Sequence, residues 1–188
     1  MRDVTYSMST SADGYIAGPD GDFAWGGPSP EAFQHWTDEI RRVGTHLLGQ
    51  RLHETMLYWD GRDDDPALSE AERDWARLWN ALPKVVFSRT LTEVQGSHAR
   101  LATDGLAEEV ARLRAEPGEG EIAIGGAGLA ADAAALDLVD EYRAMVHPVL
   151  VGGGTPFFAQ AGRQVRLRLV ETRPFPDGVV LHRYRVER

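Results

Sequence analysis

Three glycines within four residues, Gly125, Gly126 and Gly128, are the residues of this chain whose type and spacing best suit phosphate binding. They follow a short apolar run at residues 122–124 that is typical of a buried strand, and a helical pattern begins at Leu129. Glycines leave the backbone bare at such a turn, so amide groups at a helix N-terminus can approach an anion closely. The stretch therefore predicts a nucleotide phosphate site. The alternative is a plain strand-to-helix turn, which needs only one glycine.

Two further groups at the ends of predicted strands have similar chemistry. The apolar run 45–48 ends at Gly49 and leads into a helical turn that begins with Gln50 and Arg51, and an arginine there could pair with a phosphate. The apolar run 85–87 ends in two hydroxyls and a guanidinium, which could also bind a phosphate. The three residues of this second group are Ser88, Arg89 and Thr90.

The stretch 126–131 also fits the G-x-G-x-x-A pattern of a dinucleotide-binding Rossmann fold. Its context argues against that fold. The helix that follows is short, and the acidic pair Asp140 and Glu141 stands at the start of the next strand instead of at its far end, where a ribose would lie.

A carboxylate that could be catalytic lies at the start of the first predicted helix. Ser29 followed by Pro30 is typical of a helix start, and Glu31 falls in the first turn. The alternative is that Glu31 only interacts with the helix dipole.

The remaining pattern predicts strands that alternate with helices, and hence an α/β sheet that binds ligands at the carboxyl ends of its strands. A long loop after a first strand at 4–8 holds large apolar groups, which either cap the core or cover a flat ligand. Ser69 and Glu72 form a capping box, and Thr103 with Asp104 is expected to cap a later helix. Residues 165–186 predict an antiparallel hairpin.

Composition excludes several functions. The 188 residues suit one domain, residues 1–188, with 43% hydrophobic and 26% charged residues. A net charge of −9 disfavours nucleic acid as a partner. The absence of cysteine, of paired histidines and of a Gly-x-Ser-x-Gly elbow gives no support for a metal site or a nucleophilic hydrolase. No signal peptide or membrane-spanning run is found, so we expect a cytoplasmic protein with no membrane partner.

Together these pieces resemble the dihydrofolate reductase-like superfamily, and within it the reductase domain of the riboflavin-biosynthesis deaminase-reductase. The resemblance covers nearly the whole chain. It implies a three-layer α-β-α sandwich around a mixed, mostly parallel sheet with a C-terminal antiparallel hairpin, binding NADPH. The stretches that carry it are residues 11–18, 48–51, 84–91, 124–129, 139–142 and 147–154.

The resemblance also implies roles for individual positions. Ile16 and Ala17 would contact the nicotinamide carboxamide, and Ser88, Arg89 and Thr90 would bind the adenosine ribose and its 2′-phosphate. The family's Gly-Arg-x-Thr pattern is altered here, which leaves the choice of NADPH over NADH open. The altered stretch, which would line the remaining phosphate surface, consists of Gly49, Gln50, Arg51 and Leu52. The pyrophosphate would lie on Gly125, Gly126, Ala127, Gly128 and Leu129.

The resemblance also implies a proton donor, because dihydrofolate reductases use an acid on the first helix. The nearest candidate in this chain is Glu31. A carboxylate in an aromatic pocket would have its pKa raised by desolvation, which suits an acid that works near neutrality. The aromatic residues expected to line this pocket and bind substrate are Trp25, Phe33 and Trp36. If Glu31 faces water instead, bound water would supply the proton.

By this resemblance the protein is expected to be an NADPH-dependent reductase, like dihydrofolate reductase or 5-amino-6-(5-phosphoribosylamino)uracil reductase. The substrate would be a small heterocycle, pterin-like, folate-like or pyrimidine-ribose, or a carbonyl compound. A second hypothesis is a nucleotide-binding sensor or scaffold without turnover. A third is an interaction protein, since the apolar terminal segments could form a homodimer interface.

Overall fold

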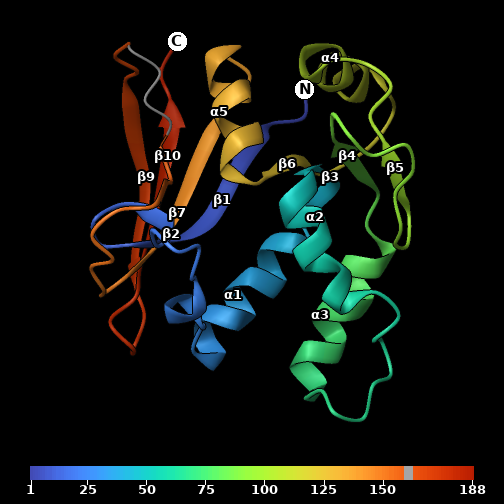
Figure 1. Cartoon of the computed structure of the whole chain (residues 1–188). Coiled ribbons are helices and arrows are strands. Elements are labelled where there is room, and N and C mark those ends of the chain that lie inside the picture. Colours follow the sequence, from blue (N-terminus) through green and yellow to red (C-terminus); the bar gives the residue numbers. More distant parts are fainter. Residues whose placement is uncertain (159–162) are drawn as a thin grey trace.

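An eight-stranded sheet runs through the molecule in the order β5-β4-β3-β6-β1-β7-β10-β9 (Figure 1). The computed structural model describes residues 1–158 and 163–188. The strands of this sheet are β1 (Val4–Ser11), β3 (Val43–Gly49), β4 (Lys84–Phe87), β5 (Ala99–Leu101), β6 (Glu121–Gly125), β7 (Glu141–His147), β9 (Leu167–Pro174) and β10 (Val180–Val186). A separate short pair joins β2 (Tyr15–Ala17) to β8 (Thr155–Pro156).

Neighbouring strands from β5 to β7 are all parallel, and β10 is antiparallel to both β7 and β9. This is the mixed, mostly parallel sheet with a C-terminal hairpin that the sequence predicts. The carboxyl ends of β1, β3, β4, β6 and β7 therefore meet at one edge, which is where open α/β sheets bind ligands.

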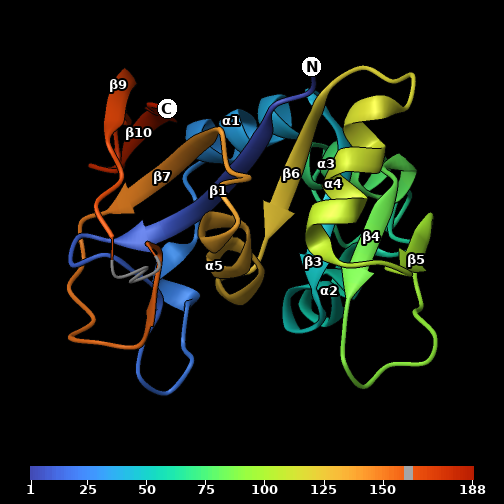
Figure 2. The same ribbon diagram turned by 90° about the horizontal axis from the view of Figure 1, so that it is seen from above.

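Helices cover both faces of the sheet. Figure 2 shows α4 and α5 in front of the sheet and α1 and α3 behind it. The front layer packs its apolar side chains on β1, β3, β4 and β6 in one core cluster, and the rear layer packs in two smaller clusters. The helices are α1 (Pro30–Ile40), α2 (Gln50–Met56), α3 (Glu70–Ala81), α4 (Leu106–Ala115) and α5 (Ala127–Ala135), with short 3-10 turns η1 (Ala24–Gly26) and η2 (Leu57–Trp59).

Capping explains where two of these helices begin. The Ser29 hydroxyl accepts a bond from the Ala32 amide at 3.3 Å at the start of α1, and the predicted capping box of Ser69 and Glu72 is present in α3. The expected cap of α4 is wrong. Its N-cap is Gly105, and no side chain caps it.

A buried guanidinium ties the rear layer to the sheet. Arg143 on β7 is 3% exposed and lies 2.6 Å from Glu141, 2.8 Å from Glu121 on β6 and 3.3 Å from Glu39 on α1. Burial lowers the pKa of Arg143, but the three carboxylates outweigh it and the pKa is raised. None of the helices among the described residues is long and apolar enough to span a membrane.

Candidate active site at the carboxyl edge of the sheet

The first two predicted phosphate sites lie side by side. Leu48 on β3 pairs with Gly125 on β6, so the two strands end together and α2 and α5 start next to each other. A side chain added at Gly126 would lie 3.9 Å from the Gly49 amide nitrogen. The two helix N-termini therefore form one continuous strip of backbone.

The glycines at positions 125, 126 and 128 differ in what constrains them. A side chain at Gly125 would come within 2.7 Å of Leu52 and 2.8 Å of His46, so there is no room for one. Gly126 has φ of +99°, a conformation that L side chains rarely adopt. Gly128 has neither constraint, since nothing lies within 4 Å of its missing Cβ. It leaves the first turn of α5 open, and no side chain caps this turn. These features fit the approach of a phosphate group to bare backbone.

The third predicted site joins the same strip through Gln50. The Gln50 Oε1 atom accepts bonds from the Ser88 hydroxyl at 2.6 Å and from the Thr90 hydroxyl at 3.1 Å. The Gln50 Nε2 atom donates to Glu54 at 2.8 Å. The Ser88 hydroxyl oxygen also accepts bonds from the amides of Thr90 and Leu91, which fixes the turn after β4. Gln50 thus links α2 to the loop that carries Arg89.

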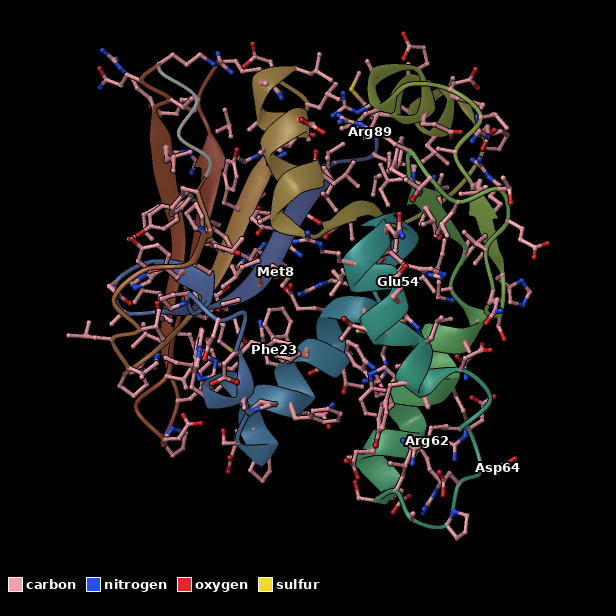
Figure 3. The ribbon with its side chains drawn as sticks, in the orientation of Figure 1. Met8, Phe23, Glu54, Arg62, Asp64 and Arg89 are labelled. Atoms are coloured by element: carbon pink, nitrogen blue, oxygen red, sulfur yellow. The ribbon has the colours of Figure 1, made fainter. Side chains whose placement is uncertain are left out.

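Two arginines at this edge remain available to an anion. Arg51 and Arg89 are both exposed, and neither forms an ion pair within the described residues. In the view of Figure 3, Arg89 lies between α5 and α4, above the start of α2. The three predicted groups, residues 49–52, 88–90 and 125–129, thus gather around the starts of α2 and α5.

Ile16 and Ala17 lie in β2, next to the end of β1. The Tyr15 amide donates to the Ser11 hydroxyl at 3.0 Å, and the Thr10 hydroxyl donates to the Tyr15 carbonyl at 3.2 Å. On its other side β2 pairs with β8. The β2 and β8 backbones lie so close together that a side chain at Gly154 would lie 2.1 Å from the Ala17 carbonyl oxygen.

The expected aromatic pocket around Glu31 is not found as one unit. The Phe33 ring packs on Trp75 of α3, with ring centroids 5.9 Å apart, while Trp36 packs on the cluster that includes Met145. Successive turns of α1 point these two rings at different neighbours. Glu31 itself is exposed, so the desolvated environment expected for it is absent.

Trp25 packs beside a polar pair, Ser9 and His147, that the sequence does not predict. Its ring meets His147 edge to face, with centroids 5.8 Å apart, and the His147 Nε2 atom lies 3.2 Å from the Ser9 hydroxyl. Burial lowers the pKa of His147, and Asp177 partly opposes this shift. The pair forms because Ser11 on β1 aligns with His147 on β7, which brings residues 138 positions apart together. An alternating serine run that starts a chain gives no signal for such a partner.

A cavity of about 400 Å³ lies at the opposite, amino-terminal edge of the sheet, beside Arg2 and Arg114. Both guanidinium groups are already engaged. Arg2 donates to the Gly120 carbonyl at 2.9 Å, and Arg114 donates to Asp140 at 2.6 Å. The carboxyl edge, where cations and backbone amides lie open, is therefore the better candidate site.

Comparison with known proteins identifies the family to which the chain belongs. Residues 2–181 match the model of the RibD C-terminal domain family. The uncharacterized protein YyaP of Bacillus subtilis is 32% identical over 180 residues, which cover 96% of this chain and 93% of YyaP. A solved structure from Shewanella sp. PV-4, named for riboflavin biosynthesis, has a TM-score of 0.78 at 25% identity, with all of both chains covered.

The fold extends to a more distant reductase. Dihydrofolate reductase from Enterococcus faecalis, solved with NADP(H), has a TM-score of 0.64 at 15% identity, covering 99% of this chain and 97% of that one. At this identity the likeness shows the dihydrofolate reductase-like fold alone. The match over nearly the full length identifies the chain as a member of the RibD C-terminal domain family.

Proposed function

We propose that this protein is an NADPH-dependent reductase that transfers a hydride to a small heterocyclic or carbonyl substrate. One observation carries the proposal: three strand ends, far apart in the sequence, converge at the carboxyl edge with bare backbone. Two exposed arginines, which form no ion pair within the part of the chain that the structure describes, lie beside them. Family membership supports an oxidoreductase.

The residues present fit such a cofactor. The amides from Gly125 to Leu129 would hold the pyrophosphate, and Gly49 to Leu52 would line the remaining phosphate surface. Ser88, Arg89 and Thr90 would bind the adenosine ribose and its 2′-phosphate. Ile16 and Ala17, held between β1 and β8, would orient the nicotinamide ring. The bound cofactor supplies the hydride, so the protein's part is to position the ring and exclude competing reactions.

Reduction of a C=N or C=O bond places the hydride on carbon and also needs a proton on nitrogen or oxygen. Glu31 is our candidate for delivering this proton, from the first turn of α1. Because Glu31 is exposed, it would exchange protons directly with water. Bound water is the alternative donor. Glu31→Gln should lower kcat and change its pH profile if Glu31 acts, and should leave both unchanged if water acts.

The competing hypothesis is a nucleotide-binding sensor without turnover. NADPH and NADH can be titrated against tryptophan fluorescence, followed by a search for NADPH oxidation with a panel of pterins, folates, pyrimidine-ribose compounds and carbonyls. Quenching with oxidation of at least one substrate supports the reductase. Quenching without any oxidation favours the sensor, and no quenching by either nucleotide contradicts both.

A homodimer formed through the C-terminal hairpin is a further proposal. β9 is an edge strand that exposes Leu169 (52%) and Val170 (43%), and edge strands with exposed apolar groups favour pairing with another chain. Sedimentation should then show a dimer that Leu169→Glu converts to a monomer. A wild-type monomer at high protein concentration would contradict it.

A further inference from the structure

The part of the edge next to Ile16 and Ala17, away from the phosphate strip, is where a substrate of the proposed reductase would lie. We call it the substrate side. Three contacts join its segments: Ser9 to His147, His147 to Trp25, and Asp13 to the Gly152 amide at 2.8 Å. A hydrogen bond from Ser29 lowers the pKa of Asp177 and links the β9–β10 turn to the start of α1.

These segments carry no lysine or arginine. Residues 3–40 contain seven carboxylates and no basic residue other than His35, and residues 144–158 and 174–182 also lack lysine and arginine. Arg173, just before the last segment, stacks over the Phe175 ring at 5.0 Å. Six of the carboxylates on these segments are exposed. They are Asp13, Asp20, Asp22, Glu31, Asp38 and Asp177, of which Asp38 pairs with Arg41 at 2.8 Å.

The phosphate strip has the opposite charge. Arg51 and Arg89 are exposed there, so cations and carboxylates lie at different ends of the same edge. Such an arrangement attracts an anionic cofactor to one end and repels a second anion from the other.

The substrate side also exposes apolar surface. Phe23 is 60% exposed, and in Figure 3 it lies below Met8 of β1, in front of α1. Trp25 is half-buried beside it in the chain. Aromatic faces of this kind favour flat rings. The Ser9 hydroxyl and His147 supply the neutral hydrogen-bonding groups of this region.

We propose that the substrate side accepts an uncharged or cationic ring compound and rejects its phosphorylated form. This inference rests on the proposed function and narrows its substrate class. At low ionic strength, a carboxylate about 10 Å from a phosphate dianion lowers its affinity roughly threefold. Several such carboxylates, on segments that carry no arginine or lysine, should therefore lower the affinity by roughly tenfold or more.

The test compares 5-amino-6-(5-phosphoribosylamino)uracil with the same compound after its phosphate has been removed. Binding to the NADPH-loaded protein and NADPH oxidation are both measured, at low and at physiological ionic strength. We expect the dephosphorylated compound to bind at least tenfold more tightly at low ionic strength, with any kcat/KM following the same order. Added salt should narrow this ratio, because exposed charges are screened.

A triple variant tests the carboxylates directly. Asp20→Asn, Asp22→Asn and Asp177→Asn remove three charges, while the Asn side-chain oxygen can still accept the backbone bonds that these aspartates now accept. The ratio of the affinity for the dephosphorylated compound to that for the phosphorylated compound should fall several-fold in this variant. The matched control removes three exposed carboxylates elsewhere, with Asp64→Asn, Glu70→Gln and Glu119→Gln, and should leave the ratio unchanged. Figure 3 shows Asp64 in the loop before α3, well away from Phe23.

Each outcome decides something. Equal or tighter binding of the phosphorylated compound overturns the inference, as does an equal effect of the two triple variants. Failure of both compounds to bind a protein that does bind NADPH also counts against it. Failure of NADPH itself to bind counts against the proposed function instead.

Discussion

At the scale of single residues, Arg89 and Gln50 determine what the phosphate strip can distinguish. Gln50 stands where the family pattern has arginine, and its side-chain oxygen binds the Ser88 and Thr90 hydroxyls. Because Gln50 is uncharged, the positive charge of the phosphate strip comes from Arg51 and Arg89. Arg89, on the loop that Gln50 fixes, is the residue we expect to contact a 2′-phosphate.

Arg89→Ala should weaken NADPH binding roughly 10- to 100-fold, because a charge-assisted hydrogen bond contributes about 1.5 to 3 kcal/mol. NADH lacks the 2′-phosphate, so its binding should change little. Fluorescence titration with both nucleotides measures this difference. Arg166→Ala, an exposed arginine next to β9, is the control. Equal weakening of both nucleotides would mean that Arg89 does not contact the 2′-phosphate.

A second prediction concerns Tyr6, which is fully buried on β1. Its ring stacks on Phe157 with centroids 4.7 Å apart, and its hydroxyl has no hydrogen-bond partner among the described residues. An unpartnered buried hydroxyl costs about 1 to 3 kcal/mol, so Tyr6→Phe should raise the free energy of unfolding by about 1 kcal/mol. Urea unfolding of the two proteins tests this. A loss of stability would show that the hydroxyl is hydrogen-bonded in solution.

At the scale of elements, Lys84 connects the start of β4 to the end of the loop that begins with Ser88. Its Nζ atom donates to the carbonyls of Leu82 at 2.8 Å and Ser97 at 3.0 Å, and it lies 5.0 Å from the centre of the Trp79 ring. Burial lowers the pKa of Lys84 to about 8, and Asp60 opposes this only in part.

This shift gives stability a pH dependence of known sign. Between about pH 8 and 10.5 the unfolded chain binds a proton at Lys84 that the folded chain has released, so the free energy of unfolding should rise with pH. The rise should reach about 3 kcal/mol, at about 1.4 kcal/mol for each pKa unit. In Lys84→Met this rise should disappear. If wild type and Lys84→Met show the same pH dependence in urea unfolding, the rise in the free energy of unfolding does not come from Lys84.

The sequence predicts elements well where a local signal exists. The capping box of α3, the proline at the start of α1 and the alternation of the C-terminal hairpin all produce the expected elements. β5 and the β2–β8 pair are missed, because strands of two or three residues depend on a distant partner and carry no periodicity of their own.

The same limit applies to the site. The glycine turn and the strand ends are local patterns, so their residues could be named in advance. The environments of Glu31 and His147 depend on which strand lies beside β1 and on how α1 rotates against the sheet. Local sequence determines neither property. The prediction of an aromatic pocket around Glu31 is therefore wrong, and the contact between Ser9 and His147 is not predicted.

At the scale of the whole molecule, Arg143 joins α1, β6 and β7 through Glu39, Glu121 and Glu141. Arg143→Met would leave buried carboxylates without a partner, which is expected to cost about 3 to 5 kcal/mol of stability. The control Arg166→Met should change stability by less than about 0.5 kcal/mol. Urea unfolding at pH 7 distinguishes them, and equal effects would contradict a structural role for the buried cluster.

The acid side of the stability profile follows from the same cluster. Burial raises the pKa of Glu141, but Arg143 and Arg183 outweigh it and the pKa lies below its ordinary value of 4.5. The stabilisation that ionised Glu141 provides is therefore complete above about pH 4.5, and it is lost as the pH falls through the lowered pKa. We expect a weaker loss in Arg143→Met, measured by urea unfolding between neutral and acid pH. An unchanged acid slope would show that Arg143 does not stabilise the charged carboxylate.

Lys84 is the only lysine of the chain and is 3% exposed. Reagents that couple to primary amines therefore find no exposed lysine side chain in this chain, at the candidate site or elsewhere. An amine-reactive fluorophore would leave the side chains of the carboxyl edge unmodified. Nucleotide affinities measured before and after such labelling should then agree.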